Sequence, residues 1–210
     1  MINKDISPNL KKGTFTSYFR RKQIIEVAAK TIAKQGFNNT SLEDIAANAG
    51  VSKGVISYHF ANKYNLIRDM TATLMQQMNQ FIKERVAESE TNTEKLHNYI
   101  RASIEFFYEK RDHFLVIMDV GINHSAREES NPFSPFSYRL CRHEISEIIL
   151  AGQKKGEFKV LPVEPLASNI QATIDGLGIQ YIFTSDRKHL LECQKQMLAL
   201  VDLALCNEKT

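Results

Sequence analysis

The fold of this chain is decided by residues 41–60, which read SLEDIAANAGVSKGVISYHF. Ser41 and Asp44 have the spacing of a capping box, so a short helix is predicted to begin after Ser41. Gly50 ends that helix, because glycine adopts a positive φ at no steric cost. Three apolar positions would hold this helix against the next one: Ile45, Val51 and Ile56. The stretch therefore predicts a helix-turn-helix.

The second helix of this pair is predicted to present a polar face to solvent. With 100° between successive residues, Gly54 and Tyr58 lie on the side opposite Ile56. A glycine in an exposed helical turn costs roughly 1 kcal/mol relative to alanine, which is understandable where a DNA backbone or base edge comes close. Side chains that contact phosphates or base edges surround this face. The candidate DNA-binding residues are Thr40, Ser41, Ser52, Lys53, Gly54, Val55, Ser57, Tyr58, His59 and Lys63.

The charge of the chain is unevenly distributed, although its net value is only +3. Residues 1–68 carry 11 Lys and Arg against 4 Asp and Glu, whereas residues 69–210 carry 16 against 20. This is the distribution expected if only the N-terminal part contacts a polyanion. The alternative is a three-helix packing unit whose basic and polar face merely meets water.

Four stretches carry a specific similarity: Gln23 to Ala29, Gly36-Phe37, Thr40 to Ala46, and Gly50 to Lys63. Together they resemble the DNA-binding domain of the tetracycline-repressor (TetR) family of bacterial regulators. The rest of the chain agrees with that family in its number of helices and in its length, but its sequence is generic.

The resemblance implies an all-helical homodimer that represses transcription from a double-stranded DNA operator until an unidentified small-molecule effector binds. It assigns the groove-facing recognition segment to Ser52 to His59 and a phosphate contact to Lys63. One position departs from the family pattern. The family often has two aromatic residues before the His-Phe pair, and Ser57 replaces the first of them here. A DNA contact from Ser57 would therefore be shorter-reaching.

Apolar residues repeat at helical spacing along most of the chain, which predicts an all-α fold of about nine helices. A flexible basic arm is predicted for residues 1–17, the helix-turn-helix domain for 18–62, and a ligand-binding and dimerisation domain for 63–206. Only Phe158 to Leu161 has the character of a strand, and it has no evident partner. The predicted helices cover residues 18–35, 41–49, 52–60, 62–90, 94–110, 114–122, 136–155, 165–184 and 187–206.

Two further sites are expected in the C-terminal domain. The family needs a ligand pocket, and an aromatic-rich stretch either lines it or belongs to the core. The candidate ligand-binding residues are Met78, Ile104, Phe107, Phe114 and Met118. The only charged residues expected near them are Glu105, Glu109 and Asp119, so a largely apolar ligand is expected. Apolar stripes on the last two helices exceed what a monomer exposes. They predict a dimer interface at Ile170, Ile174, Leu177, Met197 and Val201.

The composition of the chain, and the wide spacing of its histidines and cysteines, argue against several other classes of protein. With 43% apolar and 24% charged residues, the chain is not disordered. No apolar run approaches the ~18 residues of a membrane span. The first residues, Met1 to Asp5, contain no apolar stretch like that of a signal peptide, so secretion is not expected. With only three cysteines, a reduced cytoplasmic protein is expected. The sequence predicts no catalytic residue and no cofactor. His189 and Cys193 are spaced to share a metal ion, but no further ligand is evident near them, so no metal site is predicted. The alternative function is a helical small-molecule-binding module or a cryptic enzyme without DNA binding.

Overall fold

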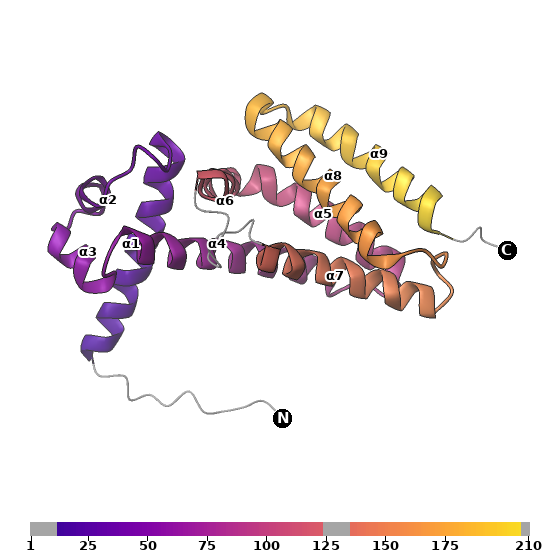
Figure 1. Cartoon of the computed structure of the whole chain (residues 1–210), viewed down its shortest axis with the longest axis horizontal. Coiled ribbons are helices and arrows are strands. Elements are labelled where there is room, and N and C mark those ends of the chain that lie inside the picture. The colour runs from indigo at the N-terminus through magenta and orange to yellow at the C-terminus, as the bar shows by residue number, and fades with distance from the viewer. Residues whose placement is uncertain (1–11, 124–134, 207–210) are drawn as a thin grey trace. The chain divides into compact units, whose positions relative to one another are not determined.

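A computed structural model shows an all-helical chain (Figure 1). It describes residues 12–123 and 135–206, with side chains for 17–123 and 142–206. The prediction of an all-α fold with about nine helices is confirmed for these ranges. The helices are α1 (Lys12–Gln35), α2 (Leu42–Ala49), α3 (Lys53–His59), α4 (Lys63–Val86), α5 (Asn92–Glu109), α6 (Arg111–Asn123), α7 (Pro135–Lys154), α8 (Val163–Thr184) and α9 (Arg187–Leu205).

Contacts divide the chain into two compact units, the first ending at Met70 and the second beginning at Thr71. The division therefore falls inside α4, whereas the sequence suggested a boundary between residues 62 and 63, where α4 begins. The first turns of α4 belong to the first unit, where the apolar side chains of Leu66 and Met70 are fully buried.

The first unit is a three-helix arrangement in which α1 contacts both α2 and α3. The buried face of α1 has helical periodicity, with Ile24, Ala28 and Ile32 spaced four residues apart and almost inaccessible to solvent. Ile45 of α2 and Ile56 of α3 are likewise fully buried. Burial of a side chain of this size contributes about 1.5–3 kcal/mol, so these contacts set the orientation of α2 and α3.

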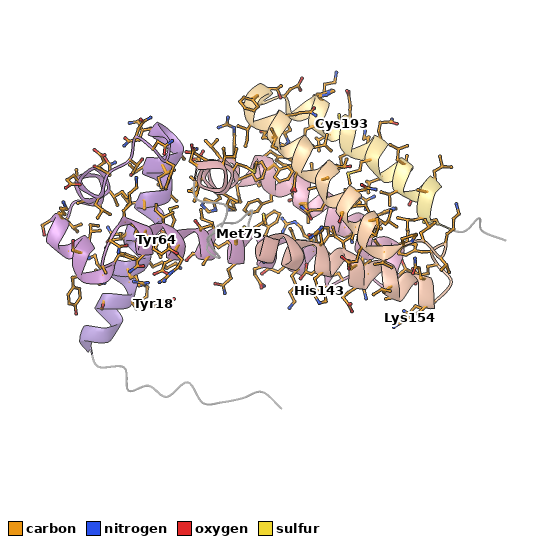
Figure 2. The ribbon with its side chains drawn as sticks, in the orientation of Figure 1. Tyr18, Tyr64, Met75, His143, Lys154 and Cys193 are labelled. Atoms are coloured by element: carbon orange, nitrogen blue, oxygen red, sulfur yellow. The ribbon has the colours of Figure 1, made fainter. Side chains whose placement is uncertain are left out.

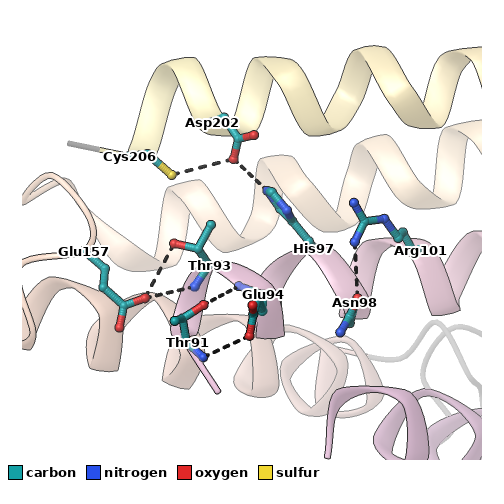
Figure 3. Close-up of polar contacts among 9 residues, drawn as sticks. All are labelled: Thr91, Thr93, Glu94, His97, Asn98, Arg101, Glu157, Asp202 and Cys206. Atoms are coloured by element: carbon teal, nitrogen blue, oxygen red, sulfur yellow. Dashed lines mark hydrogen bonds and ion pairs between the residues drawn. The ribbon is translucent and has the colours of Figure 1, made fainter. Parts of the chain in front are cut away.

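In the second unit α5 is the central helix and contacts α6, α7, α8 and α9. A capping box begins it, because Thr91 Oγ1 accepts from Glu94 N at 3.1 Å. The Glu157 carboxylate, which follows α7, accepts from Thr93 N at 3.0 Å (Figure 3). His97 Nε2 lies 2.6 Å from Asp202 Oδ1 on α9. These polar contacts fix the position of α5 relative to the end of α7 and to α9.

Several boundaries differ from the predicted ones. α1 begins at Lys12, so residues 12–17 are helical and do not belong to the predicted arm, of which residues 1–11 lie outside the described range. α4 ends at Val86 and not near residue 90, because a turn precedes the capping box of α5. Most of the connection between the predicted helices 114–122 and 136–155 lies outside the described residues, and α7 begins at Pro135, one residue before the predicted start.

The segment after α7 does find a pairing partner, contrary to the prediction. Phe158 forms an isolated antiparallel bridge with Cys206, and Lys159 N donates to Leu205 O at 2.7 Å. The partner is the end of α9 rather than another strand, which sequence spacing could not reveal. Phe158 is buried against Gly152, where any Cβ would overlap its ring. The glycine thus permits this close approach.

Candidate functional site

The turn between α2 and α3 has the geometry that its sequence predicts. Ser41 Oγ accepts from Asp44 N at 3.1 Å, and the Asp44 carboxylate accepts from Ser41 N at 2.8 Å, which completes the capping box. Gly50 ends α2 in the left-handed conformation, with φ +65°. Both local predictions are confirmed. Because these bonds lie within a few residues, the turn is set by local sequence.

The face of α3 that points away from the core is open to solvent. Ile56 and Phe60 face inward and are buried, whereas Tyr58 is 80% exposed. A Cβ at Gly54 would meet only Ser52 Oγ, at an ordinary 3.6 Å, so packing within the unit does not require glycine there. The absence of a side chain leaves the α3 backbone accessible to an external surface.

The candidate DNA-binding residues differ in accessibility. Most are exposed or half-buried side chains at or near α3. Thr40 is the exception: it is 2% exposed and its hydroxyl donates to Gly36 O at 2.7 Å. Its side chain therefore supports the turn before α2 and is removed from the set that can reach DNA. The exposed candidates are Ser52, Lys53, Gly54, Ser57 and Tyr58, and the half-buried ones are Ser41, Val55, His59 and Lys63.

Internal contacts modify the charges of this surface. Lys53 forms an ion pair with Glu43 of α2, and both side chains are largely exposed. Lys63 Nζ donates to Phe37 O at 3.2 Å and lies 4.7 Å from the centroid of the Phe37 ring, and burial lowers its pKa. Lys63 is thus not the freely extended charge that its position suggested. Burial, and then the charge of Arg21, lower the pKa of His59, which favours its neutral form.

Arg21 is a supporting residue that sequence reasoning missed. Its Nη1 donates to His59 O at 2.7 Å, at the end of α3, and its guanidinium lies 4.3 Å from the centroid of the Phe60 ring. The same side chain forms an ion pair with Asp69 of α4. Arg21 therefore joins α1, α3 and α4 within the first unit. Its spacing in α1 carries no signal of this role, because the partners are distant in sequence.

A small cavity of about 50 Å³ lies in the second unit. Four of the five predicted ligand-binding residues line it: Met78, Phe107, Phe114 and Met118. Ile104 does not, because its fully buried side chain belongs to the surrounding core. Met75 of α4, labelled in Figure 2, also lines the cavity. The buried rings of Phe107 and Phe114 belong to the hydrophobic core and also form part of the cavity wall.

The cavity lining is more polar than predicted. Asn79, Tyr99, Ser103, Gln171 and Asp175 contribute to it and were missed. Gln171 and Asp175 are one turn apart on α8, so a polar pair at i and i+4 beside the apolar Ile174 was the available signal. Gln171 Nε2 donates to Asp175 Oδ1 at 2.8 Å. A carboxylate in the lining corrects the premise that the charged residues closest to this cluster are Glu105, Glu109 and Asp119.

A second, open concavity of about 680 Å³ lies between α8 and α9. Ile170, Leu177, Met197 and Val201 of the predicted interface line it. Ile174 does not: it is buried and lines the internal cavity on the other side of α8, so it cannot belong to a dimer interface. The large apolar side chains that α8 and α9 expose are Ile179, Phe183, Leu200 and Leu203. They lie beside the predicted stripes.

One of the two glycines of α8, Gly178, packs against aromatic rings of its own unit. A Cβ on Gly178 would lie 2.5 Å from Phe114 Cζ and 2.8 Å from Phe107 Cε2. Gly178 therefore permits the close approach of the aromatic rings of α5 and α6 within its own unit. Nothing lies within 4 Å of a Cβ on Gly176.

Cys193, labelled in Figure 2, is half-buried and His189 is exposed, and both line the groove between α8 and α9. Their Sγ and Nε2 atoms are 3.5 Å apart. Across the described ranges, no group of three His, Cys, Asp or Glu side chains is arranged to hold a metal ion. No helix in the described part of the chain has the length and apolar character needed to cross a membrane.

Comparison with known proteins places these features in context. Residues 24–70 match the family model of bacterial regulatory proteins of the tetR family. The nicotine-responsive transcriptional repressor HdnoR of Paenarthrobacter nicotinovorans is 26% identical over 87% of this chain and 94% of its own length. The transcriptional regulator BetI of Yersinia pestis is 28% identical over 77% of this chain and 80% of its own.

Solved structures share the fold at low identity. A TetR transcriptional regulator from Chloroflexus aurantiacus superposes with a TM-score of 0.83 at 16% identity, covering 92% of this chain and 100% of that one. A transcriptional regulator from Saccharomonospora viridis, solved in complex with choline, superposes with a TM-score of 0.77 at 20% identity, covering 91% and 100%.

Proposed function

Because this chain belongs to the TetR family of bacterial transcriptional regulators, we propose that it is a cytoplasmic repressor which leaves a palindromic operator when a small molecule binds its second unit. As a member of that family it is a helix-turn-helix DNA-binding regulator and not an enzyme. The observation that carries the proposal is the outward face of α3, on which Gly54 leaves the backbone open between Lys53 and the exposed Tyr58.

A homodimer supplies the two recognition helices that a palindrome requires. In such a dimer the two copies of α3 would enter successive major grooves, about 34–36 Å apart. The exposed apolar side chains of α8 and α9 support a four-helix interface between two copies of this chain, since a monomer seldom exposes so many on adjacent helices. The groove between α8 and α9 would then be covered by the partner's helices.

The effector is proposed to occupy the cavity of the second unit. Met75, Met78 and Asn79 line this cavity and lie on α4, the helix that begins at Lys63. A ligand larger than the cavity must displace these side chains, and α4 is continuous with the first unit. The ligand shifts operator binding only by its difference in affinity for the two states, typically about 1–3 kcal/mol. A nicotine-responsive relative and a choline-bound relative support a small organic effector.

A mobility-shift assay with the upstream region of the chain's own gene tests this function. We expect a specific complex that competitor DNA of unrelated sequence does not remove. Failure to bind that region or any selected palindrome would favour the second candidate, a helical small-molecule-binding module.

Tyr58→Ala should weaken the complex without changing its salt dependence, because Tyr58 contributes no charge.

The charge of Lys53 gives a quantitative expectation. Lys53→Ala should weaken binding to all DNA sequences and reduce the slope of log K against log salt by about one, the value for one phosphate contact. Glu43→Gln should strengthen binding, because it releases Lys53 from its ion pair and removes a negative charge beside α3. Salt titrations of operator binding measure both.

Lys30→Ala is the matched control, since Lys30 is an exposed lysine of α1 outside the candidate set. It should leave the slope unchanged. An unchanged slope for Lys53→Ala would show that Lys53 does not contact phosphate. Lys63→Ala is a less direct probe, because removal of that side chain also loosens its contact with Phe37.

A further inference from the structure

One face of α8 directs two polar side chains into the cavity of the second unit. Gln171, Ile174 and Asp175 all line the cavity, and Gly178 follows on the same face of the helix. Gln171 Nε2 donates to Asp175 Oδ1 at 2.8 Å, and the Tyr99 hydroxyl donates to Gln171 Oε1 at 3.5 Å. The carboxylate of Asp175 is therefore oriented by other residues of the cavity wall.

Aromatic rings pack directly against this part of α8. The ring centroids of Phe107 and Phe114 are 4.1 Å apart, and both rings occupy the space that a Cβ on Gly178 would need. The faces of aromatic rings attract cations. Three thioethers complete the apolar lining, and methionine side chains are polarizable and readily change conformation: Met75, Met78 and Met118.

Among the described residues that line the cavity, Asp175 is the one charged side chain, and no other carboxylate, lysine, arginine or histidine accompanies it. Two other acidic residues of this region are outside the lining: Glu105 is paired with Arg85 at 2.8 Å, and Asp119 accepts from Asn123 Nδ2 at 2.7 Å. Asp175 is half-buried, and a carboxylate in the wall of a partly enclosed site disfavours an anionic guest and favours a cationic one.

We propose that this cavity recognises an organic cation, a quaternary or protonated amine with apolar substituents. Its nitrogen lies against Asp175, and its apolar part packs on Phe107, Phe114 and the methionines. The inference rests on the proposed function only in taking this cavity as the effector site. It replaces the largely apolar ligand that the sequence suggested.

The cavity must enlarge to admit such a guest. At about 50 Å³ it holds water molecules but not a substituted amine, since small-molecule pockets usually span about 300–1,000 Å³. The flexible side chains of Met75 and Met78 are the parts of the wall that can move with least loss of packing. Both belong to α4, so entry of the cation changes the packing of that helix.

Calorimetric titration of the full chain with four probes tests the proposal. The cations are choline and benzyltrimethylammonium, and the neutral compounds are 3,3-dimethylbutan-1-ol, which has the shape of choline with carbon in place of nitrogen, and benzyl alcohol. We expect at least one cation to bind tenfold or more tightly than its neutral counterpart. Equal or weaker binding of both cations would overturn the proposal.

Asp175→Asn should lower the affinity for the cation at least tenfold and leave the neutral compounds unaffected. Asp119→Asn is the matched control, since it removes the same charge from a residue of α6 outside the lining, and it should change neither affinity. If Asp175→Asn does not fold, Gln171→Ala provides the same reading, because it removes the side chain that orients the carboxylate. Unaltered preference for cations in the folded variant would contradict the assignment.

Operator release, followed by mobility shift in the same samples, separates this inference from the proposed function. Binding of cations that depends on Asp175 but leaves the operator complex intact would support the inference and refute ligand-released repression by these cations. Release by neutral compounds, unaffected by Asp175→Asn, would refute the inference and support ligand-released repression.

Discussion

Leu200→Glu is expected to convert the protein into a monomer whose operator affinity is at least about 100-fold lower, because the second recognition helix no longer adds to binding. Leu200 is 65% exposed and lines the groove between α8 and α9. A glutamate there places an unpaired charge inside the proposed four-helix interface, which disfavours association. Light scattering at fixed concentration gives the oligomeric state, and a mobility shift gives the affinity.

Ile122→Glu is the matched control, because Ile122 is also an exposed apolar residue but lies on α6. It should remain a dimer with unchanged operator affinity. A dimer in both variants would place the interface elsewhere. Val201→Glu is unsuitable for this purpose, since Val201 is only 9% exposed and belongs to the core of the second unit. A charge at that position would unfold the unit before it tested association.

Phe107→Ala is expected to lower the free energy of unfolding by about 3–5 kcal/mol, the usual cost of truncating a buried aromatic residue to alanine. Phe107 is 3% exposed and its ring packs against that of Phe114 at a tilt of 34°. Against a total stability of about 5–15 kcal/mol, such a loss is large. Denaturant unfolding followed by circular dichroism at one protein concentration measures it.

Phe19→Ala makes the same change at an exposed position on α1 and should alter stability by no more than about 0.5 kcal/mol. A loss below about 1 kcal/mol for Phe107→Ala would mean that the rings around the cavity collapse into the space without strain. Because Phe107 belongs to both the core and the cavity wall, loss of ligand response in this variant must be judged at a temperature where it remains folded.

The helix-turn-helix could be derived from the sequence because its signals are local. The capping box of Ser41 and Asp44, the left-handed Gly50 and the inward position of Ile56 each depend on bonds or angles within a few residues. Thr40 was misassigned for a related reason. Its residue type suits a DNA contact, but its burial depends on how the α1–α2 connection folds back.

The cavity and the groove illustrate the opposite case. Helical periodicity identified α8 and α9 as amphipathic, but a helix in this unit has neighbours on more than one side. Ile174 faces the internal cavity while Leu177 lines the outer groove, although both are apolar residues of one predicted stripe. Asp175 was overlooked because a single carboxylate in a helix is ordinarily solvent-exposed.

Periodicity, capping residues and glycine conformations act over one or two helical turns, and they were sufficient for the helices, the turn and the outward face of α3. The roles of Arg21, Ile104, Ile174 and Asp175 depend on side chains that lie far away in sequence. Which of several apolar faces meets the unit's own core, a cavity or solvent follows from the simultaneous packing of α5 with four other helices. No short stretch of sequence encodes that arrangement, because each helix contributes only one wall of it.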